Sequence, residues 1–101
     1  MGAMQRELKS LITRQLRHPR GDHLAEWKRI RTETLRRFQG GPESAFVNAY
    51  IRDGAGIEEA CADAWIERRT GYRYLDDVLV YAALLATDAQ IIDPRTGKER
   101  P

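Results

Sequence analysis

The stretch IEEACADAWIERRTGYRYL, residues 57–75, is the most informative part of this chain. Small and apolar residues recur at helical spacing over residues 57–64, which predicts a short helix with a narrow apolar face. That spacing breaks at Trp65, and a second helix, rich in arginine, is expected to begin near Glu67. Helices that cross closely need a small side chain at the crossing, and Cys61 can supply it. The pattern predicts a helix-turn-helix, whose second helix can lie in a DNA major groove.

The same stretch resembles a known superfamily of DNA-binding domains. It is similar to the helix-turn-helix of small phage regulators, of transposase and resolvase DNA-binding domains, and of sigma-factor-like modules. Those families show a small pair of residues, a turn that begins with glycine, and then an Arg-Arg-Thr-x-Tyr-Arg-aromatic-Leu segment. The corresponding segments here are Ala60-Cys61, Trp65-Ile66 and residues 68–75. The resemblance implies a three-helix DNA-binding core.

Two positions depart from that pattern. Trp65 stands where the turn glycine is usual, although a left-handed backbone conformation is unfavourable for residues other than glycine. Gly71 stands where a core Val or Ile is usual, so it is expected to lose a core contact and about 1 kcal/mol of helix propensity. The turn is therefore expected to be built differently. The Trp65 side chain is expected to plug the core, and the alternative is a platform against DNA or a partner.

The composition is typical of one small globular domain. The chain has 101 residues, of which 42% are hydrophobic and 32% charged, enough for a single modest core. Apolar residues recur with a period near 3.6, and no long stretch alternates as a strand would. The expected helices are residues 5–17, 23–39, 43–52, 57–64 and 67–89. Asp22 is expected to cap the second helix, because its carboxylate can accept hydrogen bonds from first-turn amides. The sequence thus predicts an all-α fold of about five helices.

The expected domain covers residues 1–92. Residues 93–101 are polar and rich in turn-forming residues, which predicts a flexible C-terminal tail. No apolar run approaches the roughly 20 residues of a membrane span, and the N-terminus lacks the apolar stretch of a signal peptide. The single cysteine, Cys61, excludes an internal disulfide. These features predict a cytoplasmic protein with no membrane partner.

The charge is distributed unevenly along the chain. Residues 1–52 carry 11 basic and 5 acidic side chains, a net charge of +6. Residues 53–101 carry 6 basic and 10 acidic side chains, a net charge of −4. A basic half is expected of a chain that neutralises phosphates. The alternative is that basic helices simply pair with acidic ones inside the fold.

The predicted DNA contacts divide into two groups. Arginine can bond the O6 and N7 atoms of guanine, and threonine reads bases less specifically or holds phosphate. The expected base-reading residues are Arg68, Arg69, Thr70 and Arg73. Other cations and hydroxyls bind the sugar-phosphate backbone and position the domain without reading sequence. The expected backbone contacts are Lys28, Arg29, Arg36, Arg37 and Tyr72.

The segment VLVYAALLA, residues 78–86, is apolar nearly all round. Either the N-terminal helices enclose this helix as the centre of a monomer, or a second subunit covers its remaining face. The residues expected at such an interface are Leu79, Ala82, Ala83 and Ala86. In a homodimer, each subunit would present its arginine-rich helix to one half of a two-fold related DNA site.

No catalytic, metal-binding or cofactor-binding set is expected. His18 and His23 have no cysteine or carboxylate pair at ligand spacing beside them. Cys61 has no neighbouring histidine to activate it. The carboxylates of Asp76 and Asp77 point about 100° apart on a helix, so they do not converge on one ion. An enzyme is therefore the least favoured class.

The preferred interpretation is a sequence-specific DNA-binding regulator, of phage or mobile-element origin, that occupies double-stranded DNA without chemistry of its own. One alternative is an accessory factor for DNA packaging or recombination. Another is an adaptor that binds RNA polymerase or another protein on the same scaffold. The acidic residues in and before the first helix of the predicted helix-turn-helix favour this adaptor, because they would repel a DNA backbone. They are Asp53, Glu58, Glu59 and Asp63.

Overall fold

The computed structural model describes residues 4–101, so residues 1–3 of the expected domain lie outside it. The helices are α1 (Arg6–Arg17), α2 (Leu24–Arg37), α3 (Ser44–Val47), α4 (Ile57–Asp63) and α5 (Arg68–Asp88). A π-helical turn, Asn48–Arg52, continues α3, and two short strands, β1 (Ile92–Asp93) and β2 (Lys98–Glu99), follow α5. The prediction of a mostly helical fold with about five helices is confirmed.

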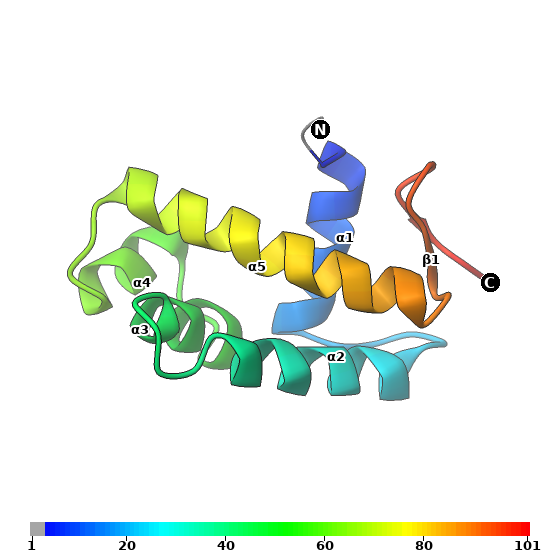
Figure 1. Ribbon diagram of the computed structural model, residues 1–101, viewed down its shortest axis with the longest axis horizontal. Coiled ribbons are helices and arrows are strands. Elements are labelled where there is room, and N and C mark those ends of the chain that lie inside the picture. Colours follow the sequence, from blue (N-terminus) through cyan, green and yellow to red (C-terminus); the bar gives the residue numbers. More distant parts are fainter. Residues whose placement is uncertain (1–3) are drawn as a thin grey trace.

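Helix α5 is the organising element of the fold. It packs against all four other helices and against β1. Its 21 residues extend over about 31 Å at a rise of about 1.5 Å per residue, most of the molecule's longest dimension of 39 Å. Figure 1 shows α2 running alongside the C-terminal half of α5 and α1 crossing α5 steeply, while α3 and α4 gather at its N-terminal end.

The core is formed where the apolar faces of α1 and α2 meet α5 and the π-helical turn. The apolar stripe predicted on α2 from Leu24 to Phe38 is confirmed in part, because Trp27, Ile30 and Phe38 are buried but Leu24 is exposed. Thr34 lies in the same stripe, and its hydroxyl donates a hydrogen bond of 2.7 Å to the carbonyl of Ile30. That bond satisfies the buried hydroxyl, which would otherwise destabilise the core. The apolar face of α1 is buried as predicted: Leu8, Leu11, Ile12 and Leu16.

The N-terminus of α2 differs from the prediction. His23, not Asp22, precedes the helix, and its side chain makes no capping hydrogen bond. The chain enters α2 through a turn in which the amide of Leu24 donates to the carbonyl of Gly21, at 3.2 Å. Asp22 lies within that turn and is exposed. The imidazole of His23 is instead 2.9 Å from the carbonyl of Arg100, so this helix end contacts the C-terminal hairpin.

The flexible tail expected at residues 93–101 is a hairpin, and this prediction is wrong. Its strands pair in antiparallel register, Ile92 opposite Glu99 and Asp93 opposite Lys98. Ile92 is buried, with 1% of its surface exposed. Gly97, with φ of 70°, turns the chain tightly, and a Cβ atom there would lie 3.2 Å from the backbone nitrogen of Leu8 in α1. Polar composition predicted disorder, but backbone pairing and docking on α1 order the segment.

Two arginines of the basic half have structural roles. The Arg17 guanidinium donates to the carbonyls of Gly54 at 2.6 Å and Ala55 at 3.0 Å. The Arg31 guanidinium donates to the carbonyl of Leu16 at 2.8 Å and to the last carbonyls of the π-helical turn. Arg17 thus ties α1 to the loop before α4, and Arg31 ties α2 to α1 and to the π-helical turn. Part of the N-terminal basic excess therefore stabilises the fold and is not available to a ligand.

Candidate nucleic-acid interface

Helices α4 and α5 are joined by a short turn with a left-handed residue. Helix α4 ends at Asp63 and α5 begins at Arg68. Between them Trp65 adopts φ of 57°, and its amide donates to the carbonyl of Ala62 at 3.1 Å. The amide of Ile66 then donates to the carbonyl of Cys61 at 3.0 Å. These bonds reverse the chain over four residues and let α5 pack back on α4.

The crossing of α4 and α5 depends on Gly71. Both Gly71 and Cys61 are buried, and a Cβ atom at position 71 would collide with the Cys61 sulfur. The same atom would lie 3.2 Å from the Phe46 ring. The expectation that Gly71 loses a core contact is therefore wrong, because the Cys61 thiol and the Phe46 ring occupy the space of the missing side chain. Glycine permits the close approach.

Trp65 is not the core plug that the sequence predicted. Its side chain is 94% exposed. The space inside the α4–α5 crossing is already filled by Cys61 and Phe46, and the left-handed turn carries the indole away from it. Trp65 therefore combines a backbone conformation that favours glycine with a large apolar surface in solvent.

We expect Trp65→Gly to raise the free energy of unfolding by about 1 kcal/mol, because it removes the steric cost of a side chain in the left-handed region. A gain of that size corresponds to a rise in Tm of roughly 4–8 °C for a domain of this size. Thermal melting followed by circular dichroism measures it. A variant that melts below wild type would show that the indole makes stabilising contacts.

The outer face of the N-terminal half of α5 carries two exposed arginines. Arg69 and Arg73 lie one helical turn apart, with Tyr72 and Asp76 beside them, because positions separated by three or four residues share a helix face. All four side chains are exposed. The Arg73 guanidinium is 6.0 Å from the ring centre of Tyr74. Among the described residues, Arg69 has no ion-pair partner.

The other two expected base-reading residues are placed differently. The Arg68 guanidinium is turned toward α4, where it pairs with the Glu58 carboxylate at 3.3 Å. It also lies 6.0 Å from the ring centre of Tyr72. Thr70 is half-buried. The structure thus gathers Arg69 and Arg73 on one accessible face and leaves Arg68 and Thr70 at its margins.

Helix α1 borders this face, which the sequence did not indicate. An open groove of about 670 Å³ runs between α1 and α5, with Lys9, Arg14 and His18 on the α1 side and Tyr72 on the α5 side. Across it, the Lys9 ammonium pairs with the Asp76 carboxylate at 3.2 Å. The sequence places the basic residues of α1 on the helix face opposite its leucines. Nothing in their spacing showed that they would lie beside α5.

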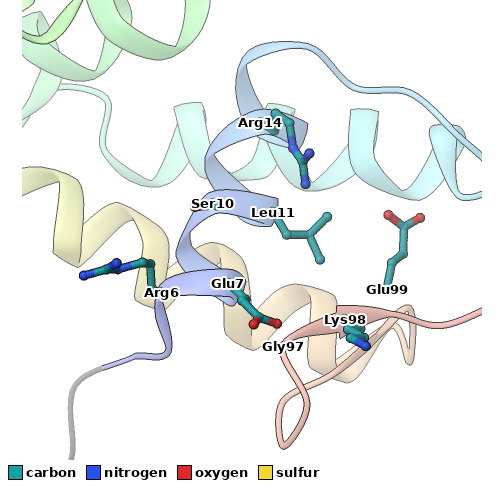
Figure 2. A pocket seen from close by; sticks show the side chains of 8 residues that line it. All are labelled: Arg6, Glu7, Ser10, Leu11, Arg14, Gly97, Lys98 and Glu99. Carbon is teal, nitrogen blue, oxygen red and sulfur yellow. The ribbon is translucent and has the colours of Figure 1, made fainter.

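A second hollow lies on the other side of α1, between that helix and the C-terminal hairpin (Figure 2). Arg14 reaches into it from α1 and Glu99 from the hairpin, while Arg6 points away. Arg14 also lines the groove beside Tyr72, so it forms a ridge between the two hollows. Glu7 and Glu99 offset the cations of this hollow, which makes it less suited to phosphate than the ridge and the α5 face.

The cations of α2 lie away from Arg69 and Arg73. Arg37 contacts Tyr81, with 5.9 Å from guanidinium to ring centre. Tyr81 is about 12 Å beyond Arg73 along α5, since each residue advances a helix by about 1.5 Å. Lys28 and Arg29 are at the opposite end of α2. Lys28, Arg29, Arg36 and Arg37 are all exposed, but the structure does not bring them together with the α5 arginines.

The expected subunit interface is part of the core, which corrects the prediction. Of its four residues, Leu79, Ala82 and Ala86 are buried within the chain and Ala83 is half-buried. Helices α1 and α2 and strand β1 pack against α5, so the chain itself covers the face of the segment that carries these residues. The C-terminal half of α5 exposes Val80 and Leu84 instead. A homodimer stays a prediction, but its contacts would have to lie elsewhere.

Within residues 4–101, no three histidine, cysteine or carboxylate side chains gather as a metal site would require. Over the same residues, none of the helices is both long and apolar enough to cross a membrane. Comparisons with protein-family models, with curated proteins and with solved structures found no match to this chain.

Proposed function

We propose that the protein binds duplex DNA with α4, the turn and α5 acting as a helix-turn-helix, and that the N-terminal half of α5 enters the major groove. The observation that carries the proposal is the pair Arg69 and Arg73, exposed one turn apart on the outer face of a long helix. The left-handed turn at Trp65 and the small crossing residues also support it, because a recognition helix must pack closely on its supporting helix.

In this arrangement the side chains have separate roles. Arg69 and Arg73 address guanine O6 and N7 in the groove. Arg68, held by Glu58 at 3.3 Å, and the half-buried Thr70 are better placed to contact phosphate at the groove edge. On α1, Arg14 supplies a further phosphate contact on the Tyr72 side of α5, whereas Lys9 is already paired with Asp76. Such contacts position the domain and carry no base information.

The biological role that fits these contacts is occupancy of an operator or promoter by a small regulator, of phage or mobile-element type by the resemblance of residues 57–75. The protein would act by binding alone. The groove beside α1 is open and carries the exposed Arg14 on the α1 side. This geometry suits the passage of a phosphate backbone along α1 better than enclosure of a small substrate.

We expect Arg69→Ala and Arg73→Ala each to weaken binding to a selected DNA site by about 1–3 kcal/mol and to relax preference at one base position. Selection from a random duplex pool followed by mobility-shift titration measures both effects. Arg14→Ala should weaken binding to all sequences similarly and reduce the salt slope by about one unit, because one fewer counterion is released.

Lys28→Ala is the matched control, since this exposed cation lies at the far end of α2. It should leave affinity and salt slope unchanged. A loss in Lys28→Ala that equals the loss in Arg14→Ala would mean that DNA contacts α2 as well as α1. The proposal fails if the wild-type protein has no affinity for duplex DNA at low salt, or if both α5 variants bind as wild type does.

A further inference from the structure

Trp65 carries two energetic costs that nothing in the described part of the chain compensates. Its indole is 94% exposed, whereas large aromatic side chains are usually mostly buried. Its φ of 57° lies in the left-handed region, which is unfavourable for a side chain of this kind. Strained residues are found preferentially at functional sites, and tryptophan is enriched among the residues that dominate protein interfaces.

Exposed acidic residues lie on both sides of Trp65 in the sequence. The exposed face of α4 carries Glu58, Glu59 and Asp63, and Glu67 follows Trp65 at the start of α5. Glu58 is neutralised by Arg68. The remaining three carboxylates have no ion-pair partner among residues 4–101. The indole is therefore accompanied by three free negative charges.

We propose that Trp65, together with Glu59, Asp63 and Glu67, is a docking surface for a basic segment of a partner protein. A guanidinium or ammonium group would stack on the indole face, where the ring quadrupole attracts cations. The carboxylates would accept charge-assisted hydrogen bonds from neighbouring basic side chains. The same carboxylates repel phosphate groups, so the surface fits a polypeptide and not a nucleic acid or an anionic membrane.

This docking surface and the proposed DNA-binding face lie on different sides of α5. Gly71, where α4 packs, follows Arg69 by two residues and is therefore turned about 200° around the helix from it. Arg69 and Arg73 point outward, whereas α4 and its acidic face lie behind them. Both surfaces can be occupied at once, which would allow a DNA-bound molecule to hold a second protein. The inference does not depend on the DNA-binding proposal.

The test uses the intact protein and a short peptide of alternating arginine and glycine as probe, with an alternating glutamate and glycine peptide as its counterpart. Nuclear magnetic resonance resolves the indole N–H signals of Trp65 and Trp27, which differ because Trp27 is buried. We expect the arginine peptide to shift the Trp65 signal and the α4 amide signals and to leave the Trp27 signal in place. The glutamate peptide should shift neither.

Variants separate the contributions of the ring and of the charges. We expect Trp65→Gly, and separately Asp63→Asn combined with Glu59→Gln, to weaken peptide binding about tenfold or more, equivalent to about 1.4 kcal/mol. Trp65→Phe should bind with intermediate affinity, because phenylalanine is a weaker cation-binding ring. Leu84→Ser is the matched control, since Leu84 is exposed on the outer face of α5 and should not contribute.

Three kinds of result would overturn the inference. The first is no Trp65 shift with the arginine peptide, or equal peptide affinity in wild type and Trp65→Gly. The second is a Trp65 shift caused by duplex DNA, which would place the indole in the DNA interface. The third is a Trp65 shift that follows protein concentration together with dimer formation in sedimentation, which would make a second copy the occupant. Loss of DNA binding in the Arg69→Ala variant leaves the arginine-peptide readouts and the concentration readout unaffected, so the two proposals fail independently.

Discussion

Trp27→Ala is expected to lower the free energy of unfolding by about 3–5 kcal/mol, as other large-to-small aromatic changes in cores do. Trp27 has no exposed surface and is the largest side chain in the core. The lost burial and the remaining cavity both contribute to the cost. Because a domain of this size has only about 5–15 kcal/mol of stability in total, the variant should be conspicuously sensitive to heat. Urea unfolding followed by circular dichroism measures the difference.

Two further substitutions sharpen this test. The indole N–H of Trp27 is buried and has no acceptor among the described residues, and such a group costs about 1–3 kcal/mol. Trp27→Phe removes that N–H and keeps most of the apolar volume, so it should lose much less than Trp27→Ala. Leu24→Ala, at an exposed position of the same helix, should change stability by no more than about 0.5 kcal/mol. A Trp27→Ala variant as stable as wild type would contradict the observed orientation of α2.

The helices could be predicted from the sequence because their signals are local. Apolar residues of α1 and α2 recur with the helical period, and a stripe of that period is buried whatever covers it. The boundaries of α4 and α5 followed from the change of pattern at Trp65 and match the structure to within a residue or so. The same kind of signal failed at the start of α2, where Asp22 has the chemistry of a cap but lies in a turn.

Features that depend on distant parts of the chain could not be predicted. The apolar run of α5 at residues 78–86 could have been a core helix or a subunit interface, since its sequence does not specify what covers it. In the structure α1, α2 and β1 cover it. The hairpin at residues 92–99 has a polar sequence, and it is ordered by its own pairing and by docking on α1. Neither partner can be identified from periodicity.

In the candidate site, too, local features could be predicted from the sequence, and features that depend on packing could not. The placement of Arg69 and Arg73 on one helix face follows from their spacing, and the structure exposes both. Which other cations join them depends on packing. The sequence pointed to the basic residues of α2 as backbone contacts, yet it is α1 that borders the groove that contains Tyr72. Trp65 was expected inside the core. The sequence did not show that the Cys61–Gly71 crossing leaves no room for its side chain there.

That crossing gives the second large expected effect. Gly71→Ala should lower the free energy of unfolding by about 2–3 kcal/mol, although alanine favours a helix over glycine by about 1 kcal/mol. The cost arises because the new Cβ atom would collide with the Cys61 sulfur and press on the Phe46 ring. Helix α5 would have to move away from α4, and the turn at Trp65 would change with it. Urea unfolding of the purified variant measures the loss.

A double-mutant cycle with Cys61→Ala tests whether the collision is the cause. Cys61→Ala alone removes one buried sulfur atom and should cost about 1 kcal/mol. In that background the space occupied by the sulfur can accept the Cβ atom of residue 71, so Gly71→Ala should become nearly neutral or stabilising. The two changes should therefore be coupled by about 1–3 kcal/mol, as for residues in direct contact. Additive losses would mean that Gly71 is needed for its backbone and not for the close approach of α4 to α5.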